Sequence, residues 1–248
     1  MLFRSAAGAT AAAKARRMSS EAQITILEGG PDISFANCGL PYYIGGDIKS
    51  RSKLILQSPE SFNEAYGVDV HVNTMAKRID RASKVVSTVN GETGEEKHFE
   101  YTKLILAQGG KPIAPPIAGA QQSHVFTLWT LKDMDNIHNY IENEKPKTAV
   151  VVGGGFIGLE MTEALVKRGL DVSVVEASQH VMTLMDAEMA GVIQEEMLSY
   201  GVKIHTGKSV TEIAKGHVVL DDGAKVAADM VLLSIGVPPP HTPPAGLT

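Results

Sequence analysis

The stretch Gly153-Gly154-Gly155-Phe156-Ile157-Gly158 limits the fold of this chain more than any other feature. It follows the apolar run TAVVV and opens a segment with helical periodicity, so it fits G-x-G-x-x-G in its required context of strand, turn and helix. Gly153 permits the tight turn, Gly155 lets the backbone approach a pyrophosphate, and Gly158 lets helix and strand pack closely. The pattern therefore predicts an α/β fold with a parallel sheet that binds a dinucleotide at this turn.

An acidic residue follows the glycines at the expected distance. The run DVSVVE reads as the next strand and ends in Glu176, where a carboxylate can hold the ribose hydroxyls of the ligand. A carboxylate there also repels a 2′-phosphate, so NADH is favoured over NADPH. The alternative is a glycine-rich turn without a ligand, and the combination of strand, helix and terminal acid argues against it.

The start of the chain has the same layout in damaged form. Residues 6–17 form a small-residue helix, and AQITILE (22–28) is a strand that ends in Glu28. The order from Gly8 to Glu28 resembles that from Gly158 to Glu176. Phe3 stands where the first glycine of a full motif belongs, and at most two residues remain for the preceding strand. We therefore expect a second dinucleotide fold whose first strand is missing.

The same N-terminal residues allow another interpretation. The first 20 residues contain four basic side chains and no acid, which suits a mitochondrial transit peptide. The position of Gly8 and the basic pair before a strand favour the helix of a dinucleotide fold instead. A cytoplasmic protein is therefore expected, with a mitochondrial one as the alternative.

Composition excludes several classes of protein. The 248 residues carry a net charge of −5, which argues against a nucleic-acid partner, and no apolar run is long enough to cross a bilayer. A single cysteine excludes an internal disulfide and favours a reducing compartment. The eight histidines are scattered without zinc-site spacing, so no metal site is expected.

The remaining segments alternate between strands and helices, as in a parallel α/β fold. GETGEE (91–96) predicts a hairpin turn, and QGGKPIAPPIAG (108–119) a crossing between domains. Further helices are expected at 40–47, 59–67, 131–144 and 187–201, and further strands at 68–73, 84–90, 103–107 and 229–236.

The only cysteine, Cys38, lies in the distinctive loop SFANCGLPYYIGG (34–46). The thiolate is the reactive form of cysteine, and the helix expected directly after the loop would favour it. The alternative is a buried, inert cysteine, but the surrounding glycines, proline and aromatic residues favour a working thiol.

Together these features resemble the pyridine nucleotide-disulfide oxidoreductase family. SFANCGLPY is similar to the active-site loop of the branch that contains coenzyme A-disulfide reductase, NADH oxidase and NADH peroxidase. LILAQGGKP (104–112) is similar to the crossing segment of the family, and LLSIGVPPP (232–240) to the segment that closes its NAD domain. The two-cysteine pattern of the glutathione-reductase branch is absent, since Ile33 and Tyr43 stand five residues from Cys38.

The resemblance implies FAD and NADH as cofactors, with electrons passing from NADH through FAD to Cys38. That thiol would form a mixed disulfide with coenzyme A, or a sulfenic acid if peroxide or oxygen is the substrate. The implied substrate contacts are Lys14, Arg17 and Asn37, and the implied cofactor contacts are Gly8, Glu28, Ala107, Gly109, Gly153, Gly155, Phe156, Ile157, Gly158, Glu160 and Glu176.

We expect residues 1–110 to form a partial FAD-binding domain with the redox-cysteine loop, 111–240 an NAD(H)-binding domain and 241–248 an irregular tail. Members of the family are about twice as long, so the chain resembles one that is truncated at both ends, without the dimerisation domain of the homodimeric relatives. Two alternatives to an active enzyme follow. One is a catalytically inactive fragment that binds NADH, and the other is a chain that aggregates through an exposed sheet edge.

Overall fold

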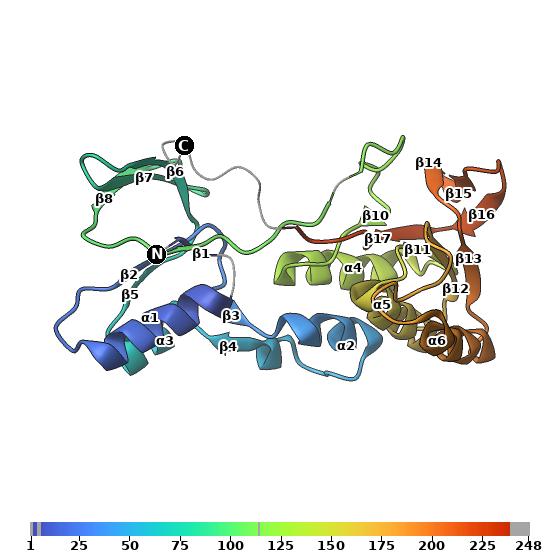
Figure 1. Ribbon diagram of the computed structural model, residues 1–248, viewed down its shortest axis with the longest axis horizontal. Coiled ribbons are helices and arrows are strands. Elements are labelled where there is room, and N and C mark those ends of the chain that lie inside the picture. The colour runs from blue at the N-terminus through green and yellow to red at the C-terminus, as the bar shows by residue number, and fades with distance from the viewer. Residues whose placement is uncertain (1, 4–5, 114, 239–248) are drawn as a thin grey trace. The chain divides into compact units, whose positions relative to one another are not determined.

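The computed structural model describes residues 2–3, 6–113 and 115–238, and it divides into two compact units. Of the described residues, 2–3, 6–36, 55–111 and 238 belong to the first unit, and 37–54, 112–113 and 115–237 belong to the second. The irregular tail expected at 241–248 lies outside the described residues. Figure 1 labels their elements. The segment that contains Cys38, which we expected within residues 1–110, belongs to the second unit.

A four-stranded parallel sheet forms the base of the first unit. Its order is β5 (Asp69–His71), β2 (Thr25–Glu28), β1 (Leu2–Phe3) and β9 (Leu106–Ala107). β1 pairs on both sides, with Phe3 opposite Glu28 and Ala107. The expectation that the first strand is missing and leaves an open edge is therefore wrong. Strand pairing uses backbone groups, so two residues suffice where a neighbouring strand lies on each side.

Helices α1 (Ala6–Met18) and α3 (Pro59–Tyr66) pack with this sheet, and both were predicted. Alanines on α1 bring its backbone close to the sheet, in a core that contains Ala12, Ile26 and Phe62. α3 ends at Gly67, which has the left-handed φ of 57° that favours glycine.

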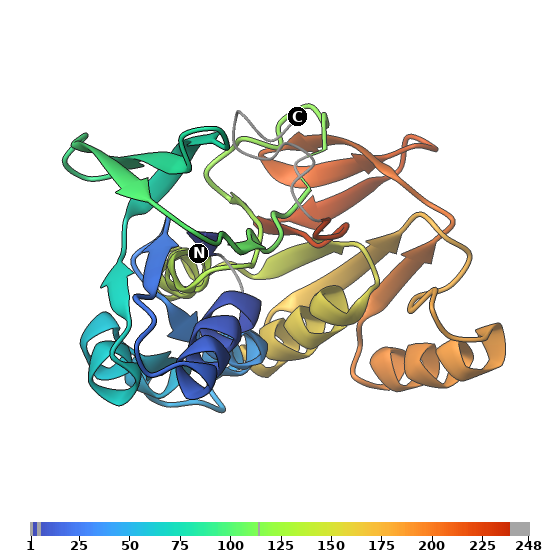
Figure 2. The same cartoon turned by 60° about the vertical axis from the view of Figure 1, so that its left-hand side comes forward.

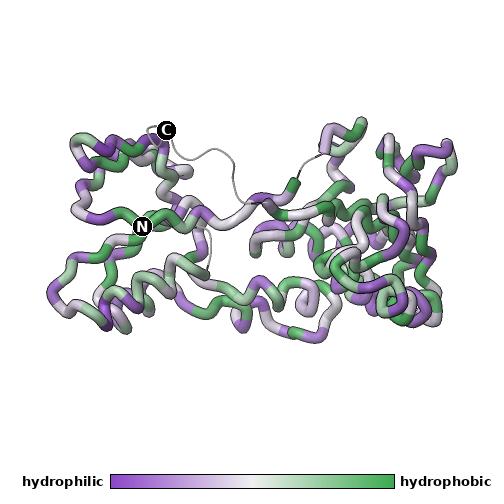
Figure 3. The backbone as a smooth tube through the Cα atoms, viewed as in Figure 1, coloured by the Kyte–Doolittle hydropathy of each residue, from purple (hydrophilic) through white to green (hydrophobic). Residues whose placement is uncertain are grey.

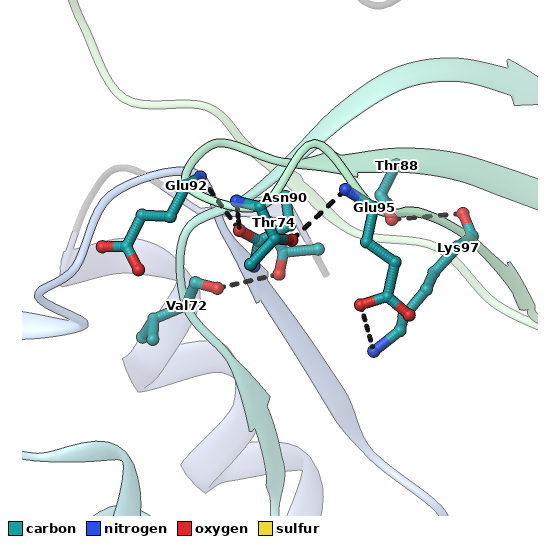
Figure 4. Close-up of polar contacts among 8 residues, drawn as sticks. Val72, Thr74, Thr88, Asn90, Glu92, Glu95 and Lys97 are labelled. Atoms are coloured by element: carbon teal, nitrogen blue, oxygen red, sulfur yellow. Dashed lines mark hydrogen bonds and ion pairs between the residues drawn. The ribbon is translucent and has the colours of Figure 1, made fainter.

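The predicted hairpin is also present. β7 (Val85–Asn90) pairs with β6 (Thr74–Asp80) on one side and with β8 (Glu96–Glu100) on the other. The Asn90 side-chain oxygen accepts hydrogen bonds from the backbone N–H groups of Glu92 and Thr93, each at 2.9 Å. Figure 4 shows this turn with Thr88 and Lys97 beside it. The short strands β3 (Ser34–Phe35) and β4 (Ile55–Gln57) complete the described strands of this unit.

The second unit contains a five-stranded parallel sheet. Its order is β10 (Val125–Phe126), β17 (Met230–Leu233), β11 (Thr148–Val152), β12 (Asp171–Glu176) and β13 (Lys203–Thr206). Helices α4 (Leu131–Glu144), α5 (Phe156–Lys167) and α6 (Ala187–Ser199) lie along one face, as Figures 1 and 2 show. The predicted sequence of strand, turn, helix and strand is confirmed.

A three-stranded antiparallel sheet covers the other face. It consists of β14 (Val210–Ala214), β15 (Gly216–Leu220) and β16 (Lys225–Ala228). Val150 and Val152 of β11 pack there against Ile213 and Val218. β11 is therefore buried on both faces, which explains its uninterrupted apolar sequence.

The segment 37–54 adds a short helical layer to the second unit. It contains the 3₁₀ turns η1 (Asn37–Gly39) and η2 (Arg51–Leu54) and the helix α2 (Leu40–Gly45), close to the predicted range. α2 packs against α5 and α4. Among the described residues no helix is long and apolar enough to cross a membrane, and Figure 3 shows hydrophilic residues interspersed through both units.

Candidate active site

Packing requires two glycines where β11 is followed by α5, Gly153 in the turn and Gly158 in the first turn of the helix. Gly153 has a φ of +105°, and a Cβ on it would lie 2.6 Å from the carbonyl oxygen of Ser234. A Cβ on Gly158 would overlap the carbonyl oxygen of Gly153 and lie 2.8 Å from the hydroxyl of Ser234. That hydroxyl donates to the carbonyl oxygens of Val152 and Gly153, each at 3.0 Å. Ser234 therefore fastens the turn, although the sequence pattern did not single it out.

Gly155 serves a different purpose, because a Cβ on it would meet nothing within 4 Å. It is the N-cap of α5, in extended conformation, and provides no side-chain cap. The N–H groups at the start of α5 have no side-chain cap and the space beside Gly155 is open, so an anionic group such as a pyrophosphate can bind there. This local geometry fits a dinucleotide.

Glu176 lies at the end of β12, beside the same turn. Its carboxylate accepts hydrogen bonds from Gly154 N at 2.7 Å and from Ser178 N at 2.8 Å. Each carboxylate oxygen can accept more than one hydrogen bond. The backbone thus fixes the orientation of the acid, and it keeps acceptor capacity for the hydroxyls of a ribose.

An apolar cleft of about 240 Å³ adjoins the turn. Gly155, Phe156 and Ile157, which the sequence motif indicated, line this cleft. Leu128 and Trp129 line it as well, although no sequence motif indicated them. Trp129 is the only tryptophan in the chain, which is the one signal that draws attention to it. The other lining residues are Pro112, Leu233, Ser234, Gly236 and Val237.

Cys38 is exposed and lies in η1, directly before α2. Its exposure contradicts the alternative of a buried, inert cysteine. The neighbouring Asn37 side-chain amide donates to the carbonyl oxygen of Trp129 at 3.4 Å. The thiol segment is thus attached to a residue that lines the cleft.

Glu160 lies on α5 and lines a narrow crevice together with Pro41 and Tyr42 of α2. Burial raises the pKa of this carboxyl, and the nearby Glu163 carboxylate raises it further. Glu160 therefore lies where the helix of the dinucleotide turn faces the helix that follows the thiol.

The first unit holds the residues selected for FAD. Gly8 is buried in α1, and Glu28 ends β2 with 4% of its surface exposed. One Glu28 carboxylate oxygen accepts from Gly30 N at 2.7 Å. Ala107 pairs with Phe3, and Gly109 has a φ of +65°.

Phe3 occupies the position of the first glycine in the structure as well as in the sequence. It lies opposite Glu28 in the parallel register, while Val152 lies opposite Val175, so that Gly153 falls opposite Glu176. The two units thus present equivalent strand ends, each with an acid beside the first position of the turn.

The three residues selected for substrate contacts are divided between the two units. Lys14 and Arg17 are exposed on α1 in the first unit, whereas Asn37 belongs to the second unit. Among the described residues no group of three or more histidine, cysteine, aspartate or glutamate side chains has the arrangement of a metal site.

Comparison with known proteins identifies the family. The model of the pyridine nucleotide-disulphide oxidoreductase family matches residues 5–246. The chain belongs to this family. Within it, the chain falls in the branch of coenzyme A disulfide reductases and NADH oxidases, and the family uses FAD and NAD(P)H.

Two curated relatives are each 34% identical to the chain. They are coenzyme A disulfide reductase from Staphylococcus haemolyticus and NADH oxidase from Methanocaldococcus jannaschii. The matches cover 94% of this chain, but only 52% and 53% of the relatives. The chain therefore spans about half the length of the curated relatives it matches.

Two solved structures share the fold over 96% of the chain. Reduced CoADR-RHD from Bacillus anthracis is 40% identical with a TM-score of 0.94, and 43% of that chain is covered. The NAD-dependent persulfide reductase from A. fulgidus is 33% identical with a TM-score of 0.92, and 46% of that chain is covered. The α/β fold thus matches the nucleotide-binding part of these enzymes.

Proposed function

We propose that this chain is part of an FAD- and NADH-dependent oxidoreductase that reduces coenzyme A disulfide, or a related thiol disulfide, through Cys38. The observation that carries the proposal is the position of Cys38. It is exposed in the same compact unit as the dinucleotide turn, and the adjacent Asn37 bonds to Trp129 of the cleft. The coenzyme A disulfide reductases among the relatives favour this substrate class.

The second unit supplies the groups for NADH. The open N-terminus of α5 at Gly155 would hold the pyrophosphate, and Glu176 would accept hydrogen bonds from the ribose. The carboxylate disfavours the additional phosphate of NADPH. The apolar cleft lined by Phe156, Ile157 and Trp129 would enclose the nicotinamide half of the coenzyme and exclude water from it.

Cys38 would act as the nucleophile on the disulfide. Its thiolate attacks one sulfur, the S–S bond of the substrate breaks, and one coenzyme A leaves as a thiolate while the other remains in a mixed disulfide with Cys38. Bound FAD would relay the two electrons of NADH that release the second thiolate. Gly8, Glu28, Ala107 and Gly109 of the first unit would contribute to holding FAD, and Lys14 and Arg17 are cations suited to the phosphates of coenzyme A.

A second candidate function is an NADH oxidase or peroxidase in which Cys38 cycles through a sulfenic acid. The NADH oxidase of Methanocaldococcus jannaschii, 34% identical to this chain, favours it. An exposed thiol without a second cysteine is compatible with both candidates.

The test combines a spectrum with turnover. The purified chain is incubated with FAD and desalted, and a retained flavin band that NADH bleaches is expected. NADH consumption with coenzyme A disulfide should then exceed that with oxygen or peroxide, and Cys38→Ser should abolish it. Preference for peroxide or oxygen would support the second candidate. Bound NADH with no retained flavin and no turnover would leave a nucleotide-binding fragment and refute both.

A further inference from the structure

We infer that Arg168 is a positioning residue that holds the Cys38 segment on the helix of the dinucleotide turn. Arg168 follows α5, and its guanidinium donates a hydrogen bond to the carbonyl oxygen of Ile44 in α2 at 3.1 Å. The same group forms an ion pair with Glu142 of α4. Only 20% of the Arg168 side chain is exposed. One guanidinium therefore joins α5, α2 and α4 at a junction from which most solvent is excluded.

The backbones of α2 and α5 approach closely beside this junction. A Cβ on Gly45 would lie 3.2 Å from the Cα of Ala164, which is closer than side chains ordinarily allow. α5 begins at the turn with Gly155 and continues past Ala164 to Arg168. The dinucleotide turn leads directly into α5, and α2, the helix that follows Cys38, packs against α5. One helix therefore supports both the turn and the Cys38 segment.

The arginine provides contacts that a lysine can replace only in part. The planar guanidinium donates to two acceptors in fixed directions, whereas an ammonium is a single point charge. The hydrogen bond from Arg168 also lowers the pKa of Glu142, as expected for a carboxylate paired with a cation. Lys167, the preceding residue, pairs with Asp47 at 3.0 Å but is 41% exposed, so its contribution to holding the segment is smaller.

A second anchor lies at the far end of the segment. Arg51 forms a fork of three hydrogen bonds of 2.9–3.0 Å with the carboxylate of Asp135 on α4. With this end fixed, loss of Arg168 should loosen α2 and η1 locally without releasing the whole segment. The inference extends the proposed function, because it assumes that Cys38 is the reactive thiol.

The experiment compares Arg168→Met and Arg168→Lys with the control Lys203→Met. Lys203 forms an exposed ion pair with Asp171 on the strands, away from α2. Amide hydrogen exchange of residues 40–46, the rate of Cys38 alkylation by iodoacetamide and the Kd for NADH are measured on the full chain. If Arg168 holds α2 and the Cys38 segment locally, its loss should change the amide exchange and the alkylation rate and leave the Kd for NADH unchanged.

In Arg168→Met we expect exchange in residues 40–46 to be about tenfold faster and alkylation of Cys38 about threefold faster, since a hydrogen bond to a charged group is lost. The Kd for NADH should stay within about twofold. Arg168→Lys should be intermediate, and Lys203→Met should match the wild type. Unchanged exchange in residues 40–46, or an equal increase throughout the second unit, would overturn the inference. A wild-type Cys38 no more reactive than glutathione would refute the proposed function, while the exchange data would still decide whether Arg168 positions α2.

Discussion

The carbonyl oxygen of Gly153 lies where a side chain on Gly158 would begin. Helix α5 therefore rests directly on the backbone of the turn that precedes it, with no side chain between them. The contact holds the N-terminus of α5 at the end of β11, where the first N–H groups of a helix can bind an anionic ligand. The glycine spacing is thus a packing requirement as well as a signature of ligand binding.

Gly158→Ala should destabilise the second unit. The added methyl group must displace backbone, since it would meet the Gly153 carbonyl and the Ser234 hydroxyl, and overpacking of this kind costs about 1–3 kcal/mol. Urea unfolding followed by circular dichroism measures the loss. The matched control is Gly191→Ala in α6, where a Cβ meets nothing within 4 Å and about 0.5–1 kcal/mol of helix propensity is gained. Equal unfolding midpoints for the two variants would contradict the packing argument.

Gly155→Ala should leave stability nearly unchanged and weaken NADH binding. The φ and ψ of Gly155, −83° and −173°, are accessible to alanine, and its Cβ would enter open space. That space is where the coenzyme backbone would approach, so we expect the Kd for NADH to rise by about tenfold or more. Calorimetric titration with NADH measures it. If Gly155→Ala binds NADH as tightly as the wild type, the pyrophosphate does not lie at this position.

Arg16 and Arg17 are adjacent in sequence but should behave differently on substitution. The Arg16 guanidinium donates to the carbonyl oxygens of Tyr66 and Gly67, both at 2.8 Å, and so joins the ends of α1 and α3. Arg16→Met should lower the unfolding free energy of the first unit by about 1.5–3 kcal/mol. Arg17 is exposed, so Arg17→Met should change it by less than about 0.5 kcal/mol. Thermal unfolding of the two variants tests this, and similar losses of stability would refute the role of Arg16 in joining α1 and α3.

Glu160→Gln should stabilise the protein at pH 7 and not in acid. Burial raises the pKa of Glu160 in the folded state above its ordinary value of 4.5, so the charged form disfavours folding. By proton linkage, the folded state binds the proton of Glu160 more tightly than the unfolded state does, so ionisation of Glu160 lowers the free energy of unfolding. The advantage of the glutamine variant should therefore shrink as the pH falls through the raised pKa toward 4.5. Urea unfolding between pH 4.5 and pH 7 measures it, and an advantage independent of pH would point to a packing effect instead.

The second unit could largely be predicted from the sequence, because its evidence is local. The apolar residues Ala149 to Val152, the glycine turn and Glu176 follow one another within 30 residues, and each has one structural explanation. The hairpin around Asn90 is local in the same sense, since its turn residues bond to the backbone within three positions.

The parts that could not be predicted depend on distant pairing. Phe3 looked like the remnant of a lost strand, and only its pairing with Glu28 and Ala107 shows that two residues complete the sheet. Trp129 lies just before α4, far from the glycine turn in sequence, and no spacing rule links it to the cleft that it lines. The difference between Arg16 and Arg17 likewise depends on α3, which is distant in sequence.

The division of the chain into residues 37–54 and 112–237 has a practical consequence for anyone who wishes to express the nucleotide-binding unit by itself. A gene segment cut at Pro112 would lack α2. Ala164 would then lose its contact with Gly45, and Arg168 would lose the carbonyl oxygen of Ile44 as a hydrogen-bond acceptor. A version that keeps these contacts would instead join residues 37–54 to the 112–237 segment through a designed linker. The natural order of the gene and the order of the folding unit are not the same.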